Sequence, residues 1–220
     1  MAASPAAENL KAFRDPPTDE ETLTLFHPAP DTQAAEVEAY IQRHPFVEHL
    51  RQNATLRESR PHLKIPEAVR SNTLTAGTLL GEDRIAVPPI QFADGEGTEM
   101  IALYYLGKSL CGHPGIVHGG LLATLMDEGL ARCCFESLPN KVGMTASLKI
   151  DYRLPCKAEQ WVVLRARTTK TEGRKAWVVG KLMALESPEE WMEGEKAKIT
   201  NGVNGERLFV EPKQAAVSWR

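Results

Sequence analysis

The sequence predicts an α+β protein in which a curved antiparallel sheet wraps around one long central helix, with a helical extension at the N-terminus. Residues 119–136 form one long apolar segment with helical spacing. Around it lie short segments that are rich in β-branched and aromatic residues or alternate in polarity, as strands do: residues 74–80, 100–105, 145–152, 161–169, 176–185 and 207–210. A sheet that encloses the helix explains why the helix is apolar on most sides.

The N-terminal part of the chain differs in composition. Residues 1–32 are rich in Ala, Pro and acidic side chains, so we expect them to be mostly disordered or loosely attached. Residues 33–53 have helical spacing, and Pro45 marks a break or a new start. The chain therefore divides into three parts: an extension over residues 1–70, a main domain over 71–213 and a tail over 214–220.

Two Asn-Gly pairs near the end of the main domain are typical of turns, namely Asn201-Gly202 and Asn204-Gly205. We expect turns at these positions, near the end of the sheet.

Composition limits the classes of partner. The 220 residues are 42% hydrophobic and 25% charged, which is ordinary for a globular protein. The formal net charge of −3 gives neither a basic footprint for nucleic acid nor a polybasic membrane anchor. No apolar run approaches the ~20 residues of a membrane span. We expect a soluble protein without a nucleic-acid partner.

The four cysteines, at positions 111, 133, 134 and 156, form no Cys-x-x-Cys motif. We expect no disulfide framework, which favours a reducing compartment. The N-terminus lacks the apolar core of a secretory signal, and its early acidic residues argue against a mitochondrial transit peptide. The cytoplasm is the expected location, with mitochondria as the alternative.

The start of the long helix has the features of an anion-binding site. Gly119 and Gly120 follow His118 directly, and the apolar helix begins there. Backbone N–H groups at a helix N-terminus can hold negative charge. Each residue also has an ordinary structural explanation: a diglycine turn into the helix and a hydrogen-bonded structural histidine.

An acidic side chain inside this helix is the second notable feature. Asp127 lies on a strip of small residues that includes Ala123, Thr124 and Ala131, and it has no local partner. Glu128 differs, because Arg132 follows four residues later and offers an ordinary surface pairing. A carboxylate in an apolar segment needs a reason, and a base beside an oxyanion binder suits acyl transfer or hydrolysis.

Val-His-Gly-Gly followed by an apolar helix, with Asp nine residues after the His, resembles the hotdog-fold acyl-CoA thioesterases. The most similar type is that of the PaaI-like and thioesterase superfamily member 4-like enzymes, including fungal relatives. The resemblance covers roughly residues 71–213. Three further stretches agree with it: a strand ending in Tyr-x-x-Pro (144–155), a Gly-Arg-Lys hairpin (171–177) and a closing strand (208–212).

The resemblance implies a catalytic arrangement. Hotdog thioesterases form dimers, with sites where two subunits meet, so a homodimer or a homotetramer made of two dimers is expected. Gly119 N–H would polarise the thioester carbonyl, and Asp127 of the other subunit would activate water or attack the acyl carbon itself. Thr145 stands where relatives carry a hydroxyl that assists, and His118 would orient the loop.

The resemblance also implies substrate-binding residues. Gly120 and Glu128 adjoin the catalytic groups and are expected to line the site. Arg174 and Lys175 suit capture of the coenzyme A phosphates, although a solvated hairpin tip is equally consistent with them. Some relatives carry Asn or Gln in the loop before the helix as a second carbonyl donor. This chain has His113 there, which could fill that role.

The expected substrate is an acyl-CoA or an acyl-carrier-protein thioester, and coenzyme A enters only as part of the substrate, without a further cofactor. His113 and His118 lack a matching carboxylate set, so no metal site is expected. Two alternatives remain. The first is a hotdog dehydratase or hydratase that uses His118 with Asp127. The second is a non-catalytic acyl-CoA-binding dimer, which would not need Asp127.

Overall fold

The computed structural model describes residues 15–193 and 203–212. Its main feature is an antiparallel seven-stranded sheet in the order β1-β2-β3-β7-β8-β9-β6. The strands are β1 (Arg57–Ser59), β2 (Ile90–Ala93), β3 (Glu99–Leu106), β6 (Met144–Tyr152), β7 (Gln160–Glu172), β8 (Lys175–Ala184) and β9 (Val203–Val210). A separate hairpin pairs β4 (Cys111–His113) with β5 (Ile116–Val117).

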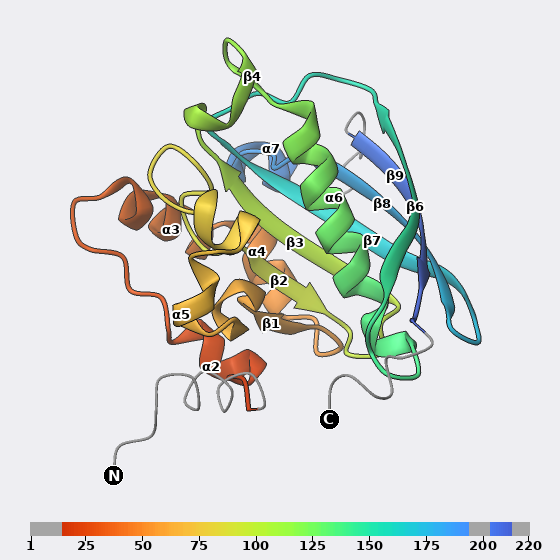
Figure 1. Ribbon diagram of the computed structural model, residues 1–220. Helices are drawn as coiled ribbons and strands as arrows, with labels where there is room; N and C mark the ends of the chain where they lie inside the picture. Colours follow the sequence, from red (N-terminus) through yellow and green to blue (C-terminus); the bar gives the residue numbers. More distant parts are fainter. Residues whose placement is uncertain (1–14, 194–202, 213–220) are drawn as a thin grey trace.

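The long helix α6 (Gly119–Cys134) lies across one face of this sheet, as Figure 1 shows. Leu125, Met126 and Leu130 are fully buried in the core between helix and sheet. The helix comes close to the strands because β8 presents Gly180 to it: a Cβ there would lie 2.5 Å from Cδ2 of Leu130. The predicted sheet wrapped around one apolar helix is therefore present.

The extension packs on the opposite face of the sheet. Its helices α3 (Gln33–Gln42) and α4 (Pro45–Arg51) bury apolar side chains such as Ile41 and Phe46 against β2, β3 and β7. In Figure 1, α4 and the short helix α7 (Pro188–Glu193) lie behind the sheet, with α6 in front. The break predicted at Pro45 is present, because His44 caps the new helix there and its Nδ1 accepts the N–H of Phe46.

The expectation of loose attachment over residues 1–32 is wrong for the described part from residue 15. The short helix α2 (Asp19–Leu23) packs beside β1, and Thr22 is fully buried. The Oγ1 of Thr22 accepts the N–H of Arg60 at 2.9 Å. Asp19 also pairs with Lys64 at 2.7 Å, and the Phe26 ring lies under the Arg60 guanidinium. The composition of the segment did not reveal this attachment, because a few specific contacts provide it. Residues 1–14 and the predicted tail over 214–220 lie outside the described residues.

The strand predicted over residues 74–80 is also wrong. Residues Leu74–Thr78 form a π-helical turn (η2) between a short helix α5 (Glu67–Arg70) and β2. Gly77 lies tightly against the preceding turn, where a Cβ would be 2.1 Å from the Arg70 main-chain oxygen. Such close packing of the backbone favours a compact turn over an extended strand.

The Asn204-Gly205 pair is a strand interior, not a turn. β9 begins at Val203, and Gly205 pairs with Ile150 of β6 and with Gly180 of β8. A Cβ at Gly205 would lie 2.5 Å from Cε of Met126, so the glycine leaves room for the end of that side chain. The pair Asn201-Gly202 lies outside the described residues. Three short helical turns complete the fold: η1 (Pro61–Lys64), η3 (Lys108–Leu110) and η4 (Phe135–Ser137).

Candidate active site

The N-terminus of α6 is capped by His118, whose Nδ1 accepts the Gly120 N–H at 2.9 Å. The neutral ring therefore carries its proton on Nε2. The Gly120 N–H is occupied by this cap. The Gly119 N–H, by contrast, meets no acceptor in the described part of the chain. It is the donor at this helix end that remains open for an anionic oxygen.

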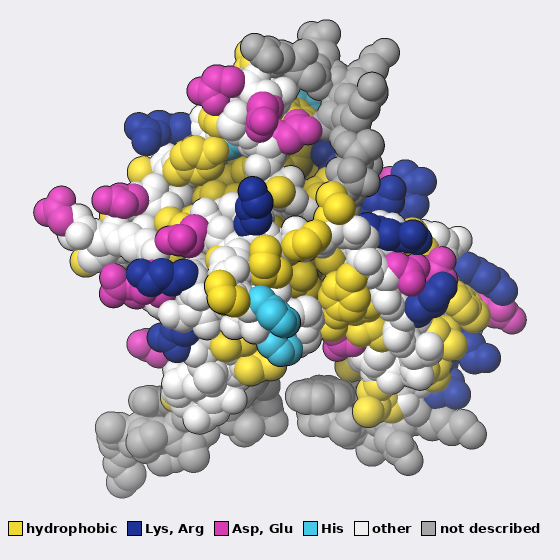
Figure 2. All heavy atoms as spheres, turned by 90° about the horizontal axis from the view of Figure 1, so that it is seen from above, with side chains coloured by type: hydrophobic (Ala, Val, Ile, Leu, Met, Phe, Trp, Pro, Cys, Tyr) yellow, Lys and Arg dark blue, Asp and Glu magenta, His cyan; other side chains and the backbone are white. Residues whose placement is uncertain are grey.

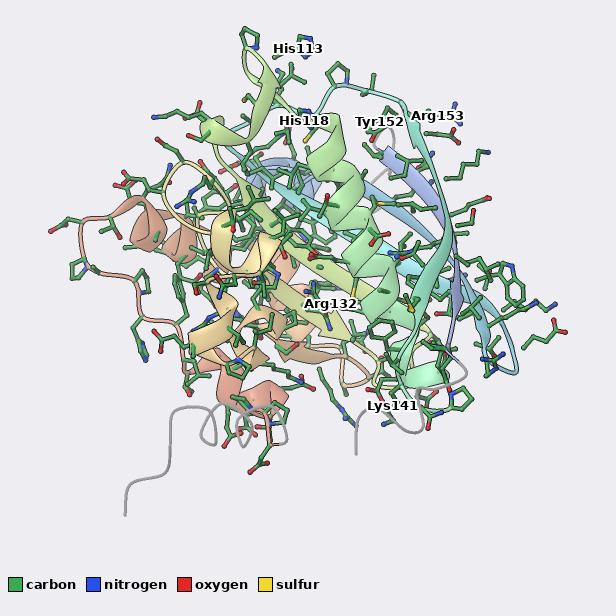
Figure 3. The ribbon with its side chains drawn as sticks, viewed as in Figure 1. His113, His118, Arg132, Lys141, Tyr152 and Arg153 are labelled. Atoms are coloured by element: carbon green, nitrogen blue, oxygen red, sulfur yellow. The ribbon has the colours of Figure 1, made fainter. Side chains whose placement is uncertain are left out.

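Tyr152 lies directly over Gly119. Its hydroxyl donates to the Gly119 main-chain oxygen at 2.8 Å, and a Cβ at Gly119 would be 3.5 Å from the ring. Figure 3 shows Tyr152 beside His118, where the end of β6 meets the start of α6. The sequence places this tyrosine only in a Tyr-x-x-Pro turn. Its contact with the diglycine could not be read from spacing, because 33 residues separate the two positions.

Asp127 is held by two side chains from the sheet. Its Oδ1 lies 2.6 Å from Nη2 of Arg207 on β9 and accepts from Thr145 Oγ1 on β6 at 3.3 Å. Asp127 was expected to lack a local partner, and both of its partners are distant in sequence. Arg207 is 80 positions away and cannot be seen on a helical wheel. The Asp127 side chain is 41% exposed, whereas that of Arg207 is 2% exposed.

Gly119 and Asp127 do not meet within one chain. They are eight positions apart on α6, which is about 12 Å along a helix that rises ~1.5 Å per residue. A thioester carbonyl at Gly119 is thus out of reach of Asp127 in the same protomer. The structure brings together Asp127 with Thr145, and separately His118, Gly119 and Gly120.

Glu128 faces away from this site toward the π-helical turn η2. Both of its carboxylate oxygens accept from Thr75 Oγ1, at 3.0 and 2.8 Å, and the expected partner Arg132 is 3.6 Å away. Thr75 also contacts Nε2 of the fully buried His62 at 3.3 Å. Burial, together with the charge of Arg132, holds the pKa of His62 well below its ordinary value. This cluster joins the extension to α6.

The remaining predicted residues lie apart from the helix start. His113 is exposed on the β4–β5 hairpin (Figure 3). Arg174 donates through Nη1 to the Glu211 main-chain oxygen at 2.7 Å, and Lys175 is exposed on β8. Lys175 pairs with Val210 at the Met144 end of β6. Tyr152 and Gly119 mark the other end, about 26 Å away at ~3.3 Å per residue.

A groove of about 720 Å³ crosses the sheet face opposite α6. Its basic side chains are Lys149, Arg153, Arg165, Arg167 and Lys181. In Figure 2, lysine and arginine side chains gather on the right, the side where β6, β8 and β9 lie in Figure 1. Acidic residues share the groove, and Glu99 pairs with Arg167 at 2.8 Å. Mixed charge of this kind is ordinary for a solvated sheet face.

Comparison with known proteins defines the family. Residues 114–188, which include the helix start and Asp127, match the family model described as Thioesterase superfamily. A UPF0644 protein of Schizosaccharomyces pombe is 35% identical over 185 residues, covering 84% of this chain and 68% of that protein. The chain belongs to the thioesterase superfamily. Its sheet around α6 is a hotdog fold, as the resemblance predicted.

Relatives with a named activity cover less of the chain. Acyl-coenzyme A thioesterase THEM4 of Rattus norvegicus is 39% identical over 79 residues, 36% of this chain and 33% of that protein. These matches support thioester hydrolysis in general. Among solved structures, the E. coli PaaI protein is 13% identical, with a TM-score of 0.44 over 53% of this chain and 74% of that one.

Two observations bear on location. A protein of Candida albicans named as mitochondrial is 37% identical over 120 residues, 54% of each chain, so this chain spans about half of that relative. No helix within residues 15–193 or 203–212 combines the length and the apolar composition needed to cross a bilayer. The comparisons give no support to the cytoplasmic expectation.

Proposed function

We propose that the protein hydrolyses acyl-CoA thioesters to a free carboxylic acid and CoA, at a site that two copies of the chain share. The observation that carries this proposal is Asp127: a carboxylate held by Arg207 and Thr145, yet 41% exposed at the free edge of the sheet. In a thioesterase superfamily chain, such a group is suited to act on a thioester presented from outside the protomer.

The chemistry uses the two parts of α6 in different roles. The open N–H of Gly119 polarises the thioester carbonyl and stabilises the oxyanion of the tetrahedral intermediate, a contribution worth roughly 100–1,000-fold in rate. Asp127 accepts a proton from the water that attacks the acyl carbon, the C–S bond breaks, and the CoA thiolate is protonated. Direct attack by the carboxylate, followed by hydrolysis of the anhydride, is the other route.

A second copy supplies the missing half of each site. Strand β6 is the last strand of the sheet, and its outer edge has no partner among the described strands. Met144 and Tyr152, at its two ends, are 65% and 53% exposed. A nine-residue edge strand with apolar ends is a natural surface for pairing. Antiparallel pairing there brings the Asp127 of one copy toward the Gly119 of the other.

The dehydratase alternative has little support from the geometry. It requires His118 to work with Asp127, yet His118 uses Nδ1 to cap its own helix and Asp127 is paired with Arg207. For location, relatives named mitochondrial favour mitochondria over the cytoplasm. The remaining predicted residues, Gly120, Glu128, His113, Arg174 and Lys175, stay candidates for contacts with CoA or the acyl group.

The proposal is tested by thiol release from acetyl-, hexanoyl-, palmitoyl- and phenylacetyl-CoA and from an acyl-carrier protein. We expect wild type to turn over at least one substrate and Asp127→Asn, checked for folding, to lose at least ~100-fold. Burial raises the pKa of Cys133 to about 11 and that of Cys134 to about 12, so these thiols add little background. Saturable binding without turnover would support the acyl-CoA-binding alternative instead.

A further inference from the structure

Arg207 is a charged side chain in the hydrophobic core. It projects from β9 toward α6 and is 2% exposed. Its guanidinium lies over the Phe209 ring, 4.0 Å from the ring centroid, and its Nε has no partner in the described residues. Burying an ion pair gives little net stability compared with apolar side chains of the same volume. Its position therefore suggests a role beyond packing.

The guanidinium binds a single residue at two points. Nη2 contacts Oδ1 of Asp127 at 2.6 Å, and Nη1 donates to the main-chain oxygen of the same Asp127. A planar group that bonds both the backbone and the side chain of one residue fixes the side chain relative to the helix. Thr145 adds a third bond, also to Oδ1. No hydrogen bond from the described residues reaches Oδ2, which is therefore the oxygen left for reaction.

The electrostatic surroundings of Asp127 are simple. Arg207 is the charged side chain that the sheet presents to Asp127. The charged residues of the neighbouring strands line the groove on the other face: Lys149 and Asp151 of β6, Arg165 and Arg167 of β7, Lys181 of β8 and Glu206 of β9. On its own helix, the adjacent Glu128 points to Thr75 instead. Arg207 thus determines the charge environment of the Asp127 carboxylate.

We propose that Arg207 is a positioning residue for Asp127: it fixes the orientation of the side chain and directs Oδ2 toward the thioester. This inference rests on the proposed function, in which Asp127 carries the chemistry. The Arg207 side chain is 2% exposed and is bonded to Asp127, so it acts through Asp127. Its effect should appear in kcat, with little change in KM.

The test measures kcat and KM of Arg207→Gln and Arg207→Lys, each alone and combined with Asp127→Asn. Arg207→Gln should lower kcat by roughly 100-fold, the cost of misplacing a reacting group by about 1 Å, and leave KM nearly unchanged. Arg207→Lys keeps the positive charge but not the planar group that bonds Asp127 at two points, so it should recover only part of kcat. Arg167→Gln, an exposed arginine paired with Glu99 on the other sheet face, is the matched control and should behave as wild type.

The double variant separates positioning from general structural damage. If Arg207 acts through Asp127, adding Arg207→Gln to Asp127→Asn should cost less than about twofold more. An additive loss or a rise in KM would overturn the inference, even with wild type active and Asp127→Asn inactive. If wild type itself shows no turnover, that result contradicts the proposed function. Should Arg207→Gln not fold, Arg207→Lys in the Asp127→Asn background gives the same comparison.

Discussion

The hydroxyl of Tyr152 donates a 2.8 Å hydrogen bond to the main-chain oxygen of Gly119, which fastens the end of β6 to the first residue of α6. The Gly119 N–H belongs to the preceding peptide unit and meets no acceptor among the described residues. The proposed oxyanion donor therefore lies on a residue that is bonded, through its own main-chain oxygen, to a strand 33 residues later in the chain.

Gly119→Pro tests this donor directly. Proline is well tolerated at the first position of a helix, and the preceding His118 already has the extended conformation that a following proline requires (φ −60°, ψ 126°). The substitution therefore removes the N–H with little cost to the helix. We expect a loss of roughly 100–1,000-fold in kcat, measured by thiol release.

Gly119→Ala is the matched control. It keeps the N–H, and its Cβ would make an ordinary 3.5 Å contact with the Tyr152 ring. We expect activity close to wild type. Equal losses in the proline and alanine variants would indicate a steric effect at this position and would remove the N–H from the mechanism.

Acid should destabilise the fold through His62. Burial holds the pKa of this side chain well below 6.5 in the folded protein, with the charges of Arg132 and Arg70 acting in the same direction. Below pH 6.5 His62 therefore binds a proton in the unfolded chain but not in the folded one. The free energy of unfolding therefore falls by up to about 1.4 kcal/mol per pH unit, until the pH reaches the folded-state pKa.

Urea unfolding at pH 7.5 and pH 5.5 measures this effect. His62→Gln should lose less stability between the two values than wild type, by about 1 kcal/mol. His44 is a second buried histidine whose pKa burial lowers, so His44→Gln serves as the comparison for a contribution of the same sign. An unchanged difference between pH 7.5 and 5.5 in His62→Gln would mean that the pKa of His62 is the same in the folded and unfolded chains.

Local periodicity was sufficient for the central elements. The predicted helix over residues 119–136 compares with α6 at Gly119–Cys134, and the strand predicted over residues 145–152 compares with β6 at Met144–Tyr152. These elements are long and have one strongly apolar face, so their pattern survives in the tertiary structure. The strands β1 and β2 were missed because they are only three and four residues long.

The site was predictable only where it is local in sequence. His118, Gly119 and Asp127 stand in one motif, so their chemistry could be recognised together. The partners Arg207 and Tyr152 reach the motif from distant strands, and no spacing rule connects them. The turn predicted at Asn204-Gly205 was wrong for a related reason. This glycine leaves room for Met126 of the helix above, and local sequence does not distinguish such a tertiary contact from a turn.

The shared site is tested most directly by mixing two inactive variants. Gly119→Pro keeps Asp127, and Asp127→Asn keeps Gly119, so a mixed dimer contains one intact site and one doubly defective site. With random association of equal amounts, thiol release from the best acyl-CoA substrate should recover to about a quarter of wild type. Mixed dimers that are present but remain as inactive as their components, while wild type turns over, would contradict a site built from two chains.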